Sequence, residues 1–416
     1  MIEIDKVLNT ILDDSIELPK VLVQGLTNNS SKVKKGFIFF AYKGDNYDGN
    51  EFIEDAFNNG ACLAISDSDK LESQKNVIKV DDVRTAAGIA CSNFYNFPQN
   101  KVKLIGITGT NGKTSTSTIL KSILDAENEK TLQIGTSGIK PSLDINSGLT
   151  TPDIFDLYEI LNHAVNNGFK NVVLEVSSHA LSQRRIENIS FDITAFTNLT
   201  LDHLDYHKTM EEYFFEKLKL FDLNKKNGSS VVMIDDEYGK RISELNSHAK
   251  CISLENKDVD YSCTSFSIND LGITGTLAWD SKTLDFQSKL FGSFNLENLI
   301  LAAAIAVELN ISRQSISEGI KNCTNIDGRL HLVENKINQM IFLDYGHTPD
   351  AYLKVLKTLK DNFSHPLKVL FGAGGGRDKS KRPKMAEVVE KYSVECYLAP
   401  DNPRFEDIES INNDVI

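Results

Sequence analysis

A glycine-rich stretch between a predicted strand and a predicted helix has the residue types that bind phosphate. Lys103–Ser117 reads KLIGITGTNGKTSTS and repeats a glycine every third residue, at Gly106, Gly109 and Gly112. Such a turn directs backbone N–H groups and the N-terminus of the next helix, expected from Ser115 to about Asp125, at one point that favours an anion. Lys113 can add positive charge for the outer phosphates, and the Thr114 hydroxyl can reach Mg²⁺. A nucleoside triphosphate site is therefore predicted around Gly109, Thr110, Asn111, Gly112, Lys113, Thr114 and Ser115.

The spacing of this loop departs from the strict Walker A pattern. That pattern has a glycine five residues before the glycine of Gly-Lys-Thr, and Ile107 stands there. The loop is instead a tighter variant, G-x-x-G-x-x-G-K-T. An ordinary glycine-rich turn with a surface lysine is the alternative, but strand, glycines, Lys-Thr and helix follow in the order that phosphate binding needs.

Composition limits the class of protein. The chain has 416 residues, 41% hydrophobic and 25% charged residues, and a net charge of −13. This length suggests roughly three domains at about 150 residues each, and the acidity disfavours general binding to nucleic acid or to anionic membranes. The six cysteines form no CxxC pair, and neither a signal peptide nor an apolar run of about 18 residues is evident. We expect a cytoplasmic monomer without nucleic-acid or membrane partners.

Alternating strand and helix patterns predict an α/β protein in three domains. We expect a small N-terminal α/β domain over residues 1–100 and a central domain with a largely parallel, phosphate-loop-type sheet over 101–330. A Rossmann-like C-terminal domain is expected over 331–416. Within the central domain, residues 251–291 alternate apolar and polar positions and predict an antiparallel meander. The last predicted helix, from Glu409, is still running at Ile416, so the C-terminal domain is expected to be truncated.

Two polar clusters follow predicted strands of the central domain. Glu175 ends the strand expected over 171–176, at the sheet edge where ligands bind, and its carboxylate suits Mg²⁺. A helix cap or a salt-bridge partner is the alternative. His203 and His207 lie four residues apart in NLTLDHLDYH, which allows either a zinc pair or a polar loop.

Basic residues mark two further sites. Lys217 lies in the apolar segment YFFEKLKLF. It is either a surface lysine that extends its charge to water or a buried amine that reacts with CO₂ to form a carbamate. Arg377 in a glycine-rich turn and Arg404 in Asp-Asn-Pro-Arg could each bind a carboxylate. A solvated basic loop is the alternative for Lys379, Lys381 and Arg382.

Together these segments resemble the Mur ligases of peptidoglycan synthesis, most closely the MurE type. The matching segments span nearly the whole chain and include GLTNNSSKV (25–33), GITGTNGKTST (106–116), LTTPD (149–153), LEVSSHALSQRR (174–185), TNLTLDHLDYHKTMEEYFFEKLKLF (197–221), GSFNLENLILAAA (292–304), DGRLHLVE (327–334), DYGHTPDA (344–351), FGAGGGRDKSKRPKM (371–385) and DNPR (401–404). MurE-type ligases add the third amino acid to UDP-N-acetylmuramoyl-L-alanyl-D-glutamate. The resemblance implies ATP and Mg²⁺ as cofactors.

The resemblance also implies a role for each matching residue. Catalytic roles would fall to Lys113, Glu175, His203 and Lys217. ATP would be bound by the phosphate loop together with Asn295, Asn298, Arg329 and Asp344. Mg²⁺ would be held by Thr114, Glu175, His203 and a carbamylated Lys217. The UDP-muramoyl-dipeptide would contact Ser30, Thr150, Thr151, Ser177, Gln183 and Arg185.

The amino acid would be bound by Arg377, Asp401, Asn402 and Arg404. In the family, Asp-Asn-Pro-Arg resembles the meso-diaminopimelate version, since an arginine binds the second carboxylate of diaminopimelate and repels the ammonium group of lysine. The chain departs from the family at Asn29, Ser31 and Asn50, and the family's Gly-Lys-Gly-His-Glu motif would lie beyond residue 416. We expect ligation of meso-diaminopimelate through an acyl phosphate. The alternatives are ligation of L-lysine or another amino acid, and nucleotide binding without turnover.

Overall fold

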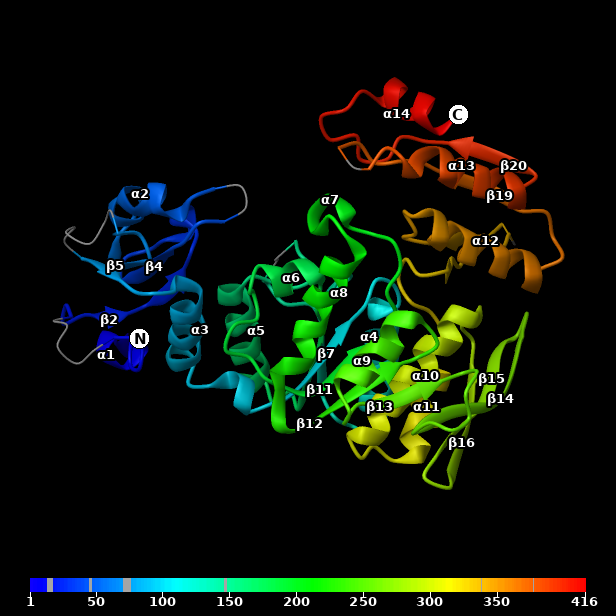
Figure 1. Cartoon of the computed structure of the whole chain (residues 1–416), viewed down its shortest axis with the longest axis horizontal. Helices are drawn as coiled ribbons and strands as arrows, with labels where there is room; N and C mark the ends of the chain where they lie inside the picture. The colour runs from blue at the N-terminus through cyan, green and yellow to red at the C-terminus, as the bar shows by residue number, and fades with distance from the viewer. Residues whose placement is uncertain (13–17, 45–46, 70–75, 146–147, 338, 377) are drawn as a thin grey trace. The chain divides into compact units, whose positions relative to one another are not determined.

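The computed structural model describes residues 1–12, 18–44, 47–69, 76–145, 148–337, 339–376 and 378–416. The chain divides into two compact units. The first unit comprises Met1–Gly106, Glu129–Thr194 and Lys219–Gly228. The second comprises Ile107–Asn128, Ala195–Leu218 and Ser229–Ile416. Figure 1 labels their helices and strands.

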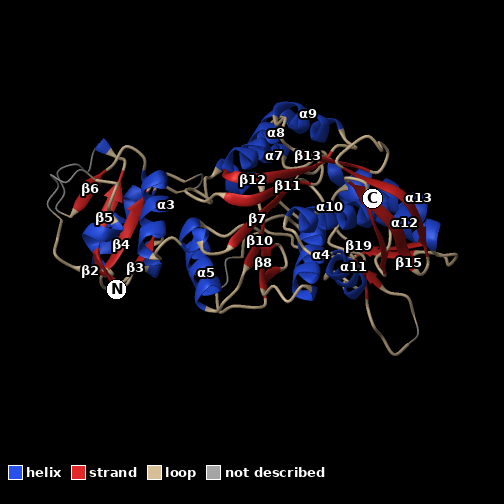
Figure 2. Cartoon of the chain, turned by 90° about the horizontal axis from the view of Figure 1, so that it is seen from below, coloured by secondary structure: helices blue, strands red, loops and turns tan. Residues whose placement is uncertain are grey.

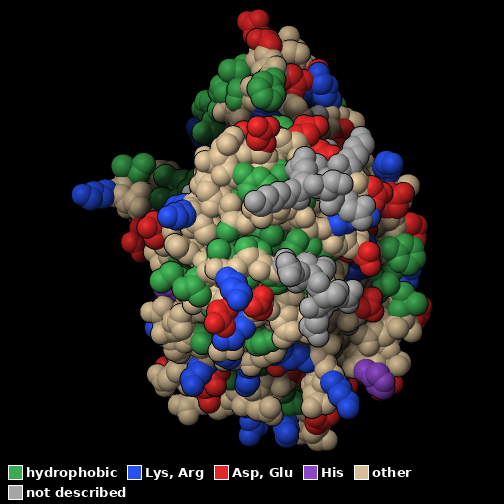
Figure 3. Space-filling view, turned by 90° about the vertical axis from the view of Figure 1, so that its left-hand side faces the viewer, with side chains coloured by type: hydrophobic (Ala, Val, Ile, Leu, Met, Phe, Trp, Pro, Cys, Tyr) green, Lys and Arg blue, Asp and Glu red, His purple; other side chains and the backbone are tan. Residues whose placement is uncertain are grey.

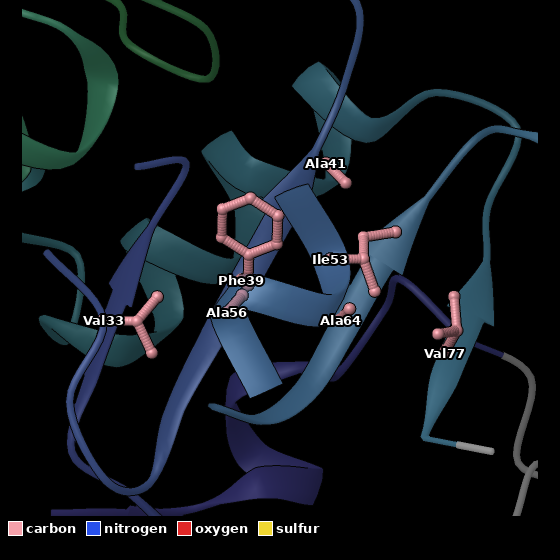
Figure 4. Packing of buried hydrophobic residues seen from close by; sticks show 7 residues of the cluster. All are labelled: Val33, Phe39, Ala41, Ile53, Ala56, Ala64 and Val77. Atoms are coloured by element: carbon pink, nitrogen blue, oxygen red, sulfur yellow. The ribbon is translucent and has the colours of Figure 1, made fainter. Parts of the chain in front are cut away.

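The first unit contains a four-stranded parallel sheet whose strands lie side by side in the order of the sequence. Its strands are β3 (Gly25–Thr27), β4 (Phe37–Ala41), β5 (Ala61–Ser66) and β6 (Val77–Lys79). Helix α2 (Ile53–Asn58) packs on this sheet through a buried cluster, drawn in Figure 4, of Val33, Phe39, Ala41, Ile53, Ala56, Ala64 and Val77. Nearby lie β1 (Ile2–Glu3), α1 (Ile4–Val7), β2 (Leu22–Val23) and α3 (Val83–Phe94). The α/β character expected for this N-terminal region is confirmed.

A ten-stranded sheet follows in the order β16-β15-β14-β13-β12-β11-β7-β10-β8-β9. Its strands are β7 (Lys103–Thr108), β8 (Thr131–Gly135), β9 (Gly138–Lys140), β10 (Asn171–Glu175), β11 (Phe191–Phe196), β12 (Asn224–Met233), β13 (Lys250–Ser253), β14 (Tyr261–Asn269), β15 (Gly272–Trp279) and β16 (Lys282–Ser288). Strands β10 and β8 pair in parallel, as do β12 and β13. The predicted α/β class is thus confirmed. The meander is confirmed for β14–β16, whereas β13 pairs in parallel with β14.

Helices cover the part of this sheet that lies in the second unit. Figure 2 shows α8 (Met210–Leu218) and α9 (Glu237–Leu245) on one side of β12 and β13, and α4 (Lys113–Ala126) and α10 (Ser293–Glu308) on the other. Helix α10 is apolar nearly all round, and α11 (Arg313–Asn322) packs against α4. The remaining helices of the sheet region are α5 (Ile154–Asn166), α6 (Ser178–Ser182) and α7 (Leu204–His207).

The end of the second unit is a smaller α/β segment. It contains β17 (His331–Leu332), β18 (Phe342–Leu343), α12 (Pro349–Asn362), β19 (Lys368–Phe371), α13 (Lys381–Tyr392), β20 (Glu395–Leu398) and α14 (Ile408–Val415). Strands β19 and β20 pair in parallel, and Ala373, Ile411 and Val415 form a small core. Strand β18 is only two residues long. The domain boundaries at 100 and 330 stay predictions.

Charge is mixed on the face that Figure 3 draws, where Lys and Arg side chains lie among Asp and Glu side chains. Among the described residues, no helix combines the length and the apolar content that crossing a membrane requires.

Candidate active site

The predicted phosphate loop joins β7 to α4 in the second unit. Helix α4 begins at Lys113, two residues before the predicted start, because Gly112 caps it with φ of 87°. Gly109 has φ of 145°, and a Cβ there would lie 1.8 Å from Thr197 Oγ1. Only glycine allows this backbone so close to its neighbours, so the glycine spacing of the sequence is explained.

Two lysines converge on one carbonyl oxygen of this loop. Lys113 Nζ donates to Gly109 O at 2.8 Å and to Thr110 O at 2.9 Å. Lys217 Nζ, from α8, donates to the same Gly109 O at 2.8 Å. Two like charges this close repel each other, and an anion beside them would relieve the repulsion. The loop is therefore prepared for a negatively charged ligand.

Lys217 is buried, so the alternative of a surface lysine is wrong. Its side chain is 1% exposed, and its ammonium lies 4.6 Å from the centre of the Tyr213 ring. Burial, together with the charge of Lys113, lowers the pKa of Lys217 well below its ordinary value. An amine that is easily deprotonated is a nucleophile, as reaction with CO₂ requires.

Tyr213 is a residue of this site that the sequence did not reveal. Its hydroxyl lies 3.2 Å from Thr110 Oγ1, and the same threonine oxygen accepts a hydrogen bond from Thr200 N at 3.0 Å. Asn198 Oδ1 accepts from Asn111 N at 3.0 Å. Helix α8 and the loop after β11 thus hold the phosphate loop in place through hydrogen bonds. An apolar helical segment with one tyrosine carries no signal for such a contact.

A pocket of about 700 Å³, its open mouth included, adjoins the phosphate loop. Within the second unit it is lined by Asn111, Gly112, Ser115, Asn198, Phe294, Glu297, Asn298, Arg329, Asp344, Gly346, His347, Thr348, Ala351, Lys354 and Val355. Asn298 Oδ1 accepts from Thr116 Oγ1 at 3.2 Å, and Asn295 Oδ1 lies 3.4 Å from Asn298 Nδ2. Of the residues expected near the nucleoside, Asn298, Arg329 and Asp344 line this pocket, and Asn295 contacts the lining residue Asn298.

Backbone N–H groups hold the Asp344 carboxylate, and the Arg329 guanidinium lies over an aromatic ring. Asp344 accepts from Leu330 N and Gly346 N, both at 2.7 Å. Arg329 lies over the Tyr345 ring at 5.2 Å, with Nη2 3.5 Å from Thr114 Oγ1. One side chain thus extends from the pocket to the start of α4.

The His203 loop contains a buried carboxylate next to the predicted metal ligand. His203 has φ of 54°, and its backbone N–H donates to Asp202 Oδ1 at 2.9 Å. Asp202 is 7% exposed and also accepts from Lys381 Nζ at 3.0 Å. Among the described residues, no three His, Cys, Asp or Glu side chains are grouped to hold a metal, which removes the support for a zinc site at His203 and His207.

Glu175 ends β10 in the first unit and is fully buried. Thr136 Oγ1 donates to Glu175 Oε2 at 3.1 Å, and a Cβ on Gly135 would lie 2.0 Å from Glu175 Oε1. A buried carboxylate needs a cation or several donors to stay ionised. A carboxylate oxygen of this kind is a ligand that suits Mg²⁺.

The residues expected to bind the UDP-linked substrate cluster within the first unit. Thr151 Oγ1 donates to Glu175 O at 2.8 Å and accepts from Ser177 N at 3.0 Å. Arg185 donates to Thr151 O at 3.1 Å and, through Nε, to Gln183 Oε1 at 2.9 Å. Thr150 lies next to Thr136, their hydroxyl oxygens 3.1 Å apart.

Ser30 lies in a short helical turn of the first unit. Its carbonyl accepts from Asn59 Nδ2 at 3.0 Å. Nearby, Asn29 Oδ1 accepts from Ser31 N at 3.0 Å and caps the turn.

The residues expected to bind the amino acid follow two adjacent strand ends in the second unit. Phe371 and Leu398, the last residues of β19 and β20, pair with each other. The Gly372–Gly376 turn and the Asp401–Arg404 segment therefore meet at the carboxyl edge of this sheet, where α/β folds bind ligands. Arg404 donates to Gly375 O. Arg377 lies outside the described residues.

The solvated-loop alternative is wrong for Arg382. Its side chain is 2% exposed and pairs with Glu406 and Asp414, both at 2.6 Å. Lys379 pairs with Glu406, and Lys381 with Asp202. These acidic partners lie far away in the sequence, so the run of basic residues gave no sign of them.

A prediction follows for Gly112. Gly112→Ala should weaken ADP binding by at least about tenfold, because a Cβ would lie 2.4 Å from Asn298 Oδ1 in a left-handed backbone. Calorimetric titration with ADP measures this. Gly138→Ala is the matched control, since Gly138 has nearly the same φ, 84°, with nothing within 4 Å of the added Cβ. Equal ADP affinity in both variants would contradict the steric explanation.

The chain matches three family descriptions in succession. Residues 22–95 match "Mur ligase family, catalytic domain", residues 107–306 match "Mur ligase middle domain", and residues 328–416 match "Mur ligase, glutamate ligase domain". These stretches contain the phosphate loop, the nucleotide pocket and the Asp401–Arg404 segment.

Curated relatives and a solved structure agree with these matches. The UDP-N-acetylmuramoyl-L-alanyl-D-glutamate–2,6-diaminopimelate ligase of Caldanaerobacter subterraneus is 40% identical over 94% of this chain and 81% of its own length. The ligase of the same name from Aquifex aeolicus is 40% identical over 95% and 81%. A solved structure of a ligase of that name, 29% identical, superposes with a TM-score of 0.76 and covers 100% of this chain and 85% of its own. The chain belongs to the Mur ligase family.

Proposed function

We propose that this protein is an ATP-dependent ligase that joins meso-diaminopimelate to UDP-N-acetylmuramoyl-L-alanyl-D-glutamate. The observation that carries the proposal is the pairing of two sites in one compact unit. A triphosphate loop with two convergent lysines serves ATP. The Asp401–Arg404 segment, at the carboxyl edge of β19 and β20, binds an amino acid that carries a second carboxylate. The relatives that match 94% and 95% of this chain carry the same activity in their names.

The proposed reaction makes an amide in two transfers. An oxygen of the D-glutamate γ-carboxylate attacks the γ-phosphorus of ATP, and ADP leaves, which gives an acyl phosphate. The amine of diaminopimelate then attacks the carbonyl carbon, loses a proton and expels phosphate. Because both carboxylate and triphosphate are anionic, the first step needs positive charge at the γ-phosphate. Lys113 supplies that charge from the loop.

We propose Thr114, Glu175, His203 and a carbamylated Lys217 as the residues that hold Mg²⁺. When bound, the ion would neutralise negative charge on the phosphates. Carbamylation joins the neutral Lys217 nitrogen to the carbon of CO₂ and releases a proton, so the buried amine becomes an anion. That anion would stand beside Lys113, where the structure places both lysine nitrogens on the Gly109 carbonyl.

We propose that the UDP-linked substrate is bound by the Thr151 cluster of the first unit. Thr151, Ser177, Gln183 and Arg185 contact one another through side chains and backbone, and a guanidinium suits a phosphate or carboxylate. We further propose that the protein acts as a cytoplasmic monomer. All six cysteines are free, and light scattering should give a mass of 46.3 kDa.

Amino-acid-dependent release of phosphate tests the proposed function. With ATP and UDP-N-acetylmuramoyl-L-alanyl-D-glutamate, meso-diaminopimelate should stimulate release and L-lysine should not. Arg404→Ala should lower kcat/KM for diaminopimelate by about 100-fold, since a charged hydrogen-bond pair is worth about 1.5–3 kcal/mol. Arg313→Ala, on α11, is the control and should leave kcat/KM unchanged. Stimulation by lysine alone would replace the proposed substrate, and stimulation by no amino acid would reject the ligase.

A further inference from the structure

Arg382 is a buried charge that the proposed reaction does not use. It is the second residue of α13 and is 2% exposed. Burying a guanidinium is costly unless its donors are satisfied. Nη1 donates to Asp414 at 2.6 Å, while Nη2 donates to Glu406 at 2.6 Å and to Gly374 O at 3.1 Å. A single side chain thus joins the start of α13 to the Gly372–Gly376 turn and to the region after Arg404.

Glu406 is the centre of these contacts. Its Oε2 accepts from Arg382 and from the Gly376 backbone N–H, the latter at 2.9 Å, and Lys379 pairs with Oε1. Arg382 and Lys379 lower the pKa of Glu406 to about 2, so this carboxylate is ionised at neutral pH. Glu406 therefore holds the Gly372–Gly376 turn in place through charge-assisted hydrogen bonds.

The glycine turn in turn contacts the segment that carries Arg404. Gly375 N donates to Asn402 O at 2.9 Å, and a Cβ on Gly375 would lie 1.9 Å from Pro403 O. The Arg404 guanidinium donates back to Gly375 O. With backbones this close, a shift of the turn must displace the Asp401–Arg404 segment as well.

Arg404 itself adopts an unfavourable backbone conformation. Its φ of 52° is left-handed, which costs a residue other than glycine about 1 kcal/mol or more. Asn402 Oδ1 accepts from Arg404 N at 3.2 Å. Such a conformation persists only where the surroundings hold it, and those surroundings are the glycine turn that Arg382 and Glu406 fix.

We propose that Arg382, acting through Glu406, is a positioning residue that holds Arg404 and the glycine turn in the arrangement that reads the incoming amino acid. This inference rests on the proposed function, because it takes Asp401–Arg404 as the amino-acid site. The Nη1 and Nη2 donors of Arg382 are engaged by Glu406, Asp414 and Gly374 O, so its effect on the substrate is indirect.

The expected effect is selective for one substrate. Loss of the Arg382–Glu406 pair should raise the KM for meso-diaminopimelate by about tenfold, as expected for a lost charge-assisted hydrogen bond. The KM values for ATP and for the UDP-linked substrate should stay within about twofold. Arg382→Lys keeps the charge but cannot span Glu406 and Gly374 O together, so it should not restore the KM.

The test combines hydrogen exchange with steady-state kinetics on the full chain. Glu406→Gln and Arg382→Lys are compared with wild type and with Lys368→Met. Lys368→Met is the matched control, because it removes an ion pair of 2.6 Å with Glu395 in the same small sheet. We expect the Gly375 and Gly376 amides to exchange about tenfold faster in the first two variants only, since their protection depends on Glu406.

Two results would overturn the proposal. One is wild-type exchange at Gly375 and Gly376 in both variants, and the other is an equal loss for all three substrates. If Arg382→Lys does not fold, Glu406→Gln decides alone, since its side chain is 18% exposed. If wild type shows no amino-acid-dependent turnover, the proposed function fails, and the exchange rates still decide whether the pair fixes the turn.

Discussion

Lys113→Ala should abolish release of phosphate from ATP, with a loss of at least about 1,000-fold in kcat. Lys113 lies in the loop itself, with Nζ on Gly109 O and Thr110 O. When a carboxylate attacks a triphosphate, negative charge accumulates at the γ-phosphate, and this ammonium is a cation of the loop itself. The loss should fall on kcat, since backbone N–H groups still bind the phosphates.

Lys121→Ala is the matched control for that measurement. Lys121 lies on the same helix and pairs with Asp125 on the surface. It should keep wild-type kcat, which separates loss of the loop cation from loss of helix stability. A Lys113→Ala variant that folds and releases phosphate at a near-normal rate would contradict the assignment of the loop.

Lys217→Ala should lower kcat by about 100-fold or more, in line with removal of a group that stabilises charge at a reacting phosphate. The reason is the proposed carbamate, which would bring a negative charge to the point where Lys113 and Lys217 share Gly109 O. Wild type supplied with ¹³C-bicarbonate should show a carbamate carbon by NMR, and Lys217→Ala should not. A short carboxylic acid should partly restore the activity of Lys217→Ala.

Lys219→Ala is the control here, because Lys219 is exposed two residues away. It should retain both the carbamate signal and the activity. Full activity of Lys217→Ala would contradict the proposed role, and so would the absence of a carbamate in an active wild type.

Carbamate formation should also depend on pH. Burial lowers the pKa of Lys217, so its amine becomes neutral at a lower pH than an exposed lysine would. CO₂ reacts with the neutral amine only, and the ¹³C signal should therefore grow as the pH rises through this lowered pKa.

The elements of the fold were largely predictable from local pattern. Helix α12 begins at Pro349 after Thr348, whose hydroxyl accepts from Ala351 N at 3.2 Å. Proline at the first position and threonine at the cap specify a helix start locally. The strand before the phosphate loop was predictable for the same reason, since its apolar run and its glycines are contiguous.

What escaped prediction depends on contacts between distant residues. Arg382 reads as a solvated residue in a basic run, and its partners Glu406 and Asp414 lie 24 and 32 residues later. Lys217 could be placed on an apolar helix, but its burial depends on the Gly109 carbonyl, 108 residues earlier. The hydrophobic period and composition of a segment predict a helix and its apolar face. Whether a charged side chain on that helix is buried depends on which other helices and strands pack against it.

Oxygen transfer tests the central claim most directly, namely that the phosphate loop presents a γ-phosphate to a carboxylate. The D-glutamate γ-carboxylate of the UDP-linked substrate is labelled with ¹⁸O at both oxygens, and the reaction is run with ATP and meso-diaminopimelate. Through an acyl phosphate, each phosphate released should carry one ¹⁸O, and the new amide should keep the other. Phosphate without ¹⁸O, whose new oxygen comes from water, would contradict the claim.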